Sequence, residues 1–192
     1  MIAAVAAGFF ALAILLLLAF QVLNRDYGVF AHAVSDYGVG KTAGLFRAYV
    51  LVASTATPLL AYLFWRSQDP AYPPAIPVYL LLMMAAQVVL GLYPNDLRGT
   101  TRTRAGQIHH AATLIAFTCA YLTIVDATPL LVATSPLGQV LSSIKHCFSL
   151  GFFAVVVTIS PPLRRWFGLA ERVFLYSCAT WFLCVSLSFD GI

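Results

Sequence analysis

The side chains best suited to chemistry in this 192-residue sequence are a few hydroxyl, carboxylate, amide and imidazole groups beside the ends of apolar segments. They are Ser35, Asp36, Asn95, Asp96, His109 and His110. An imidazole beside a carboxylate can act as a general base, relay a proton or bind a metal ion. Because neighbouring residues on a helix diverge by about 100°, at most one of the two histidines can point straight at such a site. The candidate catalytic residues are Asp36, Asp96, His109 and His110, although the same groups could instead cap helix ends.

A second polar group lies inside an apolar segment. Ser142, Lys145, His146 and Ser149 recur at steps of three and four residues, so on a helix they form one polar stripe. Ionisable side chains within a membrane span are costly and tend to mark function, so we expect the stripe to face the interior of a bundle. The candidate ligand-binding residues are Ser35, Ser142, Lys145 and His146. Lys145 requires a partner or water. Asp126 or Asp190 could be the partner, and the resulting pair could either lock the bundle or take an active part.

Six apolar segments must position these groups. The chain is 61% hydrophobic and only 9% charged, with a mean hydropathy of +0.88, whereas a soluble domain is about half apolar and about a quarter charged. This composition excludes a soluble globular protein. The segments run over approximately 2–24, 45–66, 75–93, 106–126, 137–160 and 170–188. Since a membrane span needs about 20 apolar residues, the sequence predicts an all-α bundle of six transmembrane helices, with residues 1–192 forming one domain.

The distribution of basic residues predicts the orientation of this bundle. Nine lie in or beside the first, third and fifth connections, namely Arg25, Lys41, Arg47, Arg98, Arg102, Arg104, Arg164, Arg165 and Arg172, and the opposite side carries only Arg66. By the positive-inside rule, these three connections face the cytoplasm and both termini face outward, which places the protein in the inner (plasma) membrane. The first connection is the longest, and we expect it to lie in the membrane interface or to fold back over the helix ends.

Composition also limits partners and cofactors. The net charge is +4, but no basic run is interleaved with aromatic residues, so the expected partners are membrane lipids and not nucleic acid. The cysteines are Cys119, Cys147, Cys178 and Cys184. They lie in apolar segments without a CxxC pair or the Cys/His spacing of a structural zinc site. We therefore expect small core residues, and the sequence identifies no cofactor.

The order of several short motifs resembles the bacterial membrane family DUF998. The motifs are Ser35-Asp36-Tyr37-Gly38, Gly91-Leu92-Tyr93-Pro94-Asn95-Asp96, Gly106 followed by His109 or His110, and Gly168-Leu169-Ala170-Glu171-Arg172 followed by Trp181. The resemblance spans nearly the whole chain. It implies a six-helix integral membrane protein without an established reaction, distantly similar to eukaryotic membrane proteins involved in lipid-anchor remodelling.

Two functional hypotheses follow. The first is a protein that binds or handles a lipid or small amphiphile between its helices, because the sequence offers no complete set of nucleophile, base and orienting group. The second is an intramembrane hydrolase or transferase that uses the Asp/His cluster, with or without a metal ion, on a lipid-like substrate. Under either hypothesis, we predict that Asp36 or Asp96 contacts a histidine of the fourth segment or an arginine. The arginines in reach are Arg98, Arg102, Arg104 and Arg172.

Overall fold

The structure is a computed structural model that describes residues 1–67, 72–97 and 99–189. Its long helices are α1 (Ile2–Leu23), α2 (Ala43–Ser67), α3 (Ala75–Leu92), α4 (Arg104–Thr134), α5 (Gly138–Thr158) and α6 (Phe167–Ser188). Three short 3-10 helices, η1 (Val34–Gly38), η2 (Gly40–Thr42) and η3 (Pro161–Trp166), lie in the connections. All six long helices are long and apolar enough to cross a membrane. The predicted all-α, six-helix architecture is thus confirmed, and the chain is a multi-pass membrane protein.

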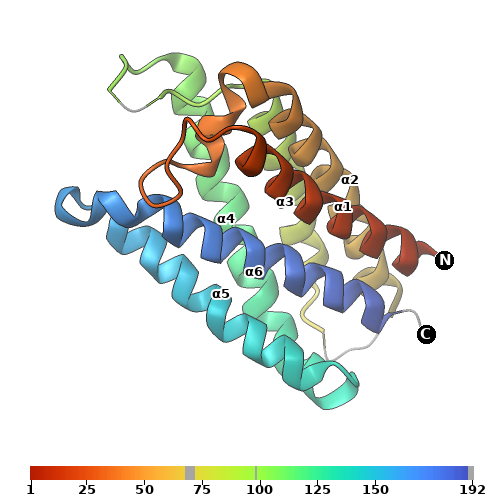
Figure 1. Cartoon of the computed structure of the whole chain (residues 1–192). Helices are drawn as coiled ribbons and strands as arrows, with labels where there is room; N and C mark the ends of the chain where they lie inside the picture. Colours follow the sequence, from red (N-terminus) through yellow and green to blue (C-terminus); the bar gives the residue numbers. More distant parts are fainter. Residues whose placement is uncertain (68–71, 98, 190–192) are drawn as a thin grey trace.

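The six helices form a ring in chain order (Figure 1). Each packs against its neighbours in the sequence, and α1 packs against α6 to close the ring. Consecutive helices run in opposite directions, as short connections require. The first, third and fifth connections therefore lie at one end of the bundle, on the left of Figure 1, and the start of α1 lies at the other. We call the former the odd-loop end.

Helix α4 is longer than the sequence predicts. The predicted segment ends at residue 126, with Pro129 in the following connection, but α4 continues through Pro129 to Thr134. A proline removes one helical hydrogen bond, yet the turn around it is held from another helix. The indole Nε1–H of Trp181 on α6 donates to Thr128 Oγ1 at 3.1 Å, and Leu131 is buried beyond the proline. The other predicted boundaries agree with the helices to within three residues.

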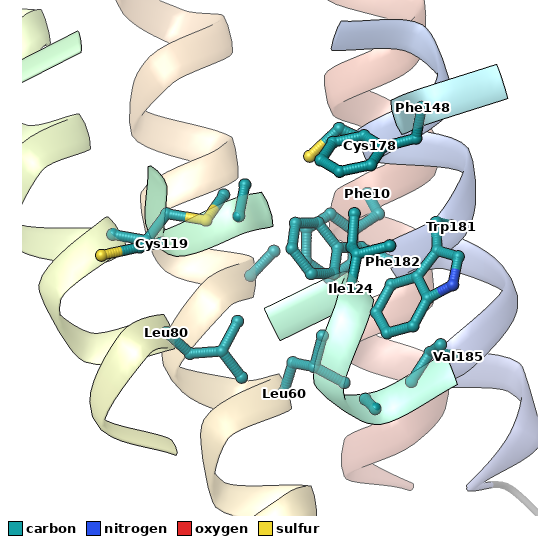
Figure 2. Close-up of a cluster of buried hydrophobic side chains, with 14 of the residues drawn as sticks. Phe10, Leu60, Leu80, Cys119, Ile124, Phe148, Cys178, Trp181, Phe182 and Val185 are labelled. Atoms are coloured by element: carbon teal, nitrogen blue, oxygen red, sulfur yellow. The ribbon is translucent and has the colours of Figure 1, made fainter. Parts of the chain in front are cut away.

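Apolar packing fills the half of the bundle remote from the odd-loop end (Figure 2). Leu60, Leu80, Ile124, Trp181 and Val185, from four helices, are fully buried there. Near mid-bundle the Phe10 ring of α1 stacks on the Phe182 ring of α6, with centroids 5.3 Å apart. This half is closely packed, and the buried charged side chains of the described residues, Asp36, Glu171 and Arg172, lie at the opposite end.

Candidate functional site: an amphipathic cavity

The first connection folds back over the odd-loop end, which is one of its two expected positions. Tyr37 of η1 is fully buried and packs against Phe20 of α1 with ring centroids 5.1 Å apart. The guanidinium of Arg172 donates to the backbone carbonyls of Val29 and His32 at 2.8 and 2.9 Å. The start of α6 therefore fixes the connection in place.

The hydrogen bonds that Arg172 makes within the described residues go to uncharged acceptors. Its remaining hydrogen bonds go to Gln21 Oε1, to the Gly168 carbonyl and, more weakly at 3.4 Å, to the Tyr37 hydroxyl. No ion pair joins it to Asp36 or to Asp96 within the described part of the chain. In the fold Arg172 holds the backbone of the first connection in place, a role that the sequence alone did not reveal.

Asp36 links the first and third connections. It is buried, and its Oδ2 accepts the Ala33 N–H at 3.0 Å. Its Oδ1 accepts a hydrogen bond from Asn95 Nδ2, also at 3.0 Å. The same Asn95 nitrogen donates to Ser35 Oγ, so one amide holds both residues of the Ser35-Asp36 pair at the inner surface of the connection.

Asp96 holds Thr103, the N-cap residue of α4. Its two carboxylate oxygens accept the backbone N–H and the hydroxyl of Thr103, each at 2.8 Å, and Thr103 Oγ1 accepts the Gly106 N–H. These hydrogen bonds lower the pKa of Asp96, and the positive charges of His110 and Arg102 lower it further. Because a Cβ at Gly106 would overlap the Asp96 carboxyl group, the glycine makes room for the cap.

The two histidines differ in burial. His109 is only 2% exposed, whereas His110 is exposed, so His109 is the one that faces the bundle. Its Nδ1 lies 2.8 Å from the carbonyl oxygen of Tyr93. A carbonyl can only accept, so Nδ1 carries the hydrogen, and in the neutral ring Nε2 keeps its lone pair.

The predicted contact between an aspartate and a cation stays a prediction. His110 and Arg102 lie near enough to Asp96 to affect its pKa, but the hydrogen bonds of its carboxylate go to Thr103. Arg98, another predicted partner, lies outside the described residues.

A cavity of about 90 Å³ lies inside the ring, bordered by α1, α2, α3, α4, α6 and η1. Its polar lining consists of Ser35, Tyr49, Gln87, His109, Thr113 and Glu171. At about 1.5 Å per residue, each of those on the long helices lies within about 14 Å of the odd-loop end of its helix. The apolar lining continues to Phe182, about 22 Å along α6. The cavity is therefore polar near the connections and apolar towards the middle of the bundle.

Glu171 is the residue of this cavity that our sequence reasoning missed as a candidate. It is 4% exposed, and its Oε2 accepts the Val34 N–H at 2.6 Å. The sequence held two signals: Glu171 belongs to one of the motifs that carry the family resemblance, and it is the only glutamate in the chain, at the start of a predicted membrane span where acids are rare. That it lines the same cavity as Ser35 depends on the fold of the first connection, which lies far away in the sequence.

The polar stripe on α5 does not face the interior, and this expectation is wrong. Helix α5 buries Leu141, Phe148, Gly151, Val155 and Thr158, whereas Ser142, Lys145 and Ser149 are only half-buried and His146 is exposed. The reason is the close packing of α5 on α6: a Cβ at Gly151 would meet the backbone of Phe174. That packing turns the Gly151 side of α5 towards α6, and the polar stripe therefore points away from the interior of the bundle.

None of the three stripe residues expected to bind a ligand lines the cavity. The imidazole of His146 bonds through Nδ1 to the Ser142 carbonyl of its own helix at 2.7 Å. Within the described part of the chain, Lys145 forms no ion pair with Asp126; Asp190 lies outside it. A binding role for Ser142, Lys145 and His146 stays untested, but the geometric reason for expecting one is removed.

No group of three or more His, Cys, Asp or Glu side chains that could hold a metal ion occurs within residues 1–67, 72–97 and 99–189. Comparison with protein families gives one match: the model described as "Protein of unknown function (DUF998)" covers residues 4–188. Neither the curated proteins nor the solved structures contain a match to the chain.

Proposed function

The chain belongs to the DUF998 family of proteins of unknown function, and we propose that it binds a single-chain amphiphile in the cavity at its odd-loop end. The observation that carries this proposal is the polarity of the cavity. An amphiphile bound there would place its headgroup among Ser35, His109 and Glu171 and its hydrocarbon chain along the apolar walls. Ligand sites are commonly built in this way, from an apolar cleft with a few polar groups that fix orientation.

The size of the cavity supports one chain and not two. A cavity of about 150 Å³ holds a benzene molecule, and this one is smaller, at about 90 Å³. It has room for the headgroup and the first few methylene groups of a single chain, and a longer chain would require the surrounding helices to move apart. Because the chain would enter from the bilayer, which is as apolar as the cavity wall, the headgroup contacts must supply most of the selectivity.

A hydrolase or transferase is the second candidate, because a hydroxyl, an imidazole and a carboxylate line one cavity. Ser35 would be the nucleophile and His109, oriented by the Tyr93 carbonyl, the base. Against this, the Ser35 hydroxyl accepts from Asn95 and makes no hydrogen bond to His109 among the described residues. The two aspartates that the sequence suggested for catalysis already accept hydrogen bonds from Asn95 and Thr103. Binding is therefore the better supported of the two.

The proposed location is the inner (plasma) membrane, with the odd-loop end in the cytoplasm. The support is the distribution of basic residues, nine beside the odd-numbered connections against Arg66 on the other side. Under this orientation the polar part of the cavity lies near the cytoplasmic surface. Cysteine labelling at Thr101 should occur from the cytoplasm, and labelling at Tyr72 from outside; the reverse pattern would overturn the orientation.

Mass spectrometry of lipids bound to the purified full-length protein tests the binding proposal. We expect a single-chain amphiphile to co-purify with the wild type and to be lost from Ala116→Leu, which adds bulk to the apolar wall. Ala111→Leu is the matched control, since Ala111 is exposed on the same helix, and it should retain the amphiphile. Absence of any amphiphile from the wild type, or equal amounts in both variants, would contradict the proposal. Release of a fatty acid from an added single-chain ester, abolished by Ser35→Ala, would favour the hydrolase instead.

A further inference from the structure

Among the described residues, Glu171 is the one acidic side chain that lines the cavity. It is almost completely buried, and only its Oε2 has a hydrogen-bond partner, the Val34 N–H. Its Oε1 has no partner among the described residues. The buried side-chain atoms without a hydrogen bond in the described part of the chain are Asn95 Oδ1 and Thr123 Oγ1, so Oε1 of Glu171 is open to the cavity that it lines. A carboxylate oxygen in a largely apolar cavity favours a hydrogen-bond donor, and a ligand could supply one.

The neighbouring cation does not fill this role. Arg172 follows Glu171 in the chain, but its hydrogen bonds go to the first connection, to Gln21 and to Gly168. No lysine or arginine is among the described residues that line the cavity. Arg172 is close enough to act on the charge of Glu171, but it does not line the cavity, so the carboxylate is the charged group that a ligand would meet on the described part of the wall.

The other polar groups nearby can also accept hydrogen bonds. Because His109 donates through Nδ1 to Tyr93, its Nε2 is an acceptor when the ring is neutral, and the Ser35 hydroxyl retains acceptor capacity. An ammonium group has three donors and no acceptor, which matches these acceptors. A carboxylate or phosphate headgroup would instead face the Glu171 carboxylate without a cation between them, and like charges at such a distance repel.

Resting on the proposed function, we propose that the cavity selects an amphiphile with a primary-amine headgroup, whose ammonium donates to Glu171 and whose single chain runs towards Phe182. Glu171 and Phe182, the two ends of this path, lie 11 residues apart on α6 (Phe167–Ser188). That separation is about 16 Å at 1.5 Å per residue. The ligand class is thus a long-chain amine, in contrast to a fatty acid or a phospholipid.

A headgroup series tests this selection. Dodecylamine, dodecanol and dodecanoate share one chain length, and each is titrated into the full-length protein in phosphatidylcholine nanodiscs, with empty nanodiscs as the baseline. We expect the amine to bind at least 10-fold more tightly than the alcohol and the carboxylate to bind most weakly. In Glu171→Gln, whose amide oxygen can still accept the Val34 N–H, the amine should lose this advantage over the alcohol.

The outcomes separate the two proposals. If all three compounds bind equally, or if dodecanoate binds best, the amine proposal is overturned while binding of a single-chain amphiphile stands. If none binds above the baseline, both are overturned. An amine preference that persists in Glu171→Gln would assign recognition to another group and overturn the role of Glu171. Because the headgroup series on the wild type needs no variant, the test remains decisive even if Glu171→Gln fails to fold.

Discussion

The imidazole of His109 on α4 bonds through Nδ1 to the carbonyl oxygen of Tyr93, 2.8 Å away, at the residue that ends α3. Carbonyls at a helix C-terminus lack partners within their own helix, so this bond satisfies the end of α3 and also fixes the direction of the ring. The same contact therefore stabilises the connection between α3 and α4 and leaves Nε2 of His109 as the hydrogen-bond acceptor of this ring.

We expect His109→Ala to destabilise the protein by about 1–3 kcal/mol, the usual effect of leaving a buried polar group without its partner. His110→Ala, at the exposed neighbouring position, should change stability by less than about 0.5 kcal/mol. Unfolding in detergent, followed by tryptophan fluorescence, measures both. Similar effects of the two variants would show that the Tyr93 contact contributes little.

The lowered pKa of Asp96 predicts a dependence of stability on pH. A carboxyl group whose pKa is lower in the folded protein stabilises it above the unfolded-state pKa, about 3.9, and this contribution disappears as the pH falls through the folded-state pKa. Melting temperatures of the wild type and Asp96→Asn should therefore differ most above about pH 5 and converge in strong acid. Asp26→Asn is the control, because Asp26 forms only an exposed ion pair with Lys41. A constant difference across this pH range would contradict the prediction.

Gly106→Ala should destabilise the third connection. The new methyl group would occupy the position of the Asp96 carboxyl group, and overpacking of this kind costs about 1–3 kcal/mol. Gly44→Ala is the control, since nothing lies within 4 Å of a Cβ there and alanine favours helix by up to about 1 kcal/mol. Thermal unfolding of the two variants should therefore shift in opposite directions, and a stabilising Gly106→Ala would exclude the observed cap.

Arg172→Lys should loosen the first connection, because an ammonium cannot reproduce the set of hydrogen bonds that the guanidinium makes. A loss of about 1–2 kcal/mol would raise the population of the detached connection roughly 5- to 30-fold. Limited trypsin digestion at Arg25 and Lys41 should speed up accordingly. Arg165→Lys is the control, because Arg165 is exposed and only stacks over Trp166; both variants keep their tryptic sites. Equal cleavage rates would show that Arg172 does not hold the connection.

Those features of the fold that depend on the residues of a single segment could be predicted from the sequence. Six apolar runs suffice to predict six helices, because the bilayer requires each to satisfy its own backbone. The extent of α4 could not be predicted, since the turn at Pro129 is supported by Trp181 from another helix. The orientation of α5 depends on Gly151 meeting the backbone of Phe174, a contact with no local signature.

The candidate site shows the same division. The sequence placed Asp36, Asp96 and His109 at one end of the bundle, because the first and third connections of a six-span protein lie on the same side of the membrane. The structure has all three residues at that end. The sequence could not show that the two aspartates have different roles, since both follow turn-forming residues. Asp96 binds the N-cap residue Thr103, whereas Asp36 is buried and binds Asn95. Nor could the sequence place Glu171 beside Val34, because that contact joins residues 137 positions apart.

The contacts of Glu171 and Arg172 with the first connection have a consequence for biogenesis. Both residues belong to α6, which is synthesised after the other five helices described here. Their partners, Val34, Val29 and His32, belong to a connection that is synthesised before α2. The ring also closes only when α6 packs on α1. A nascent chain that stops before α6 would hold five inserted helices around an open interior. The cavity would thus be completed only when α6 is inserted, because α6 both closes the ring and supplies part of the cavity wall.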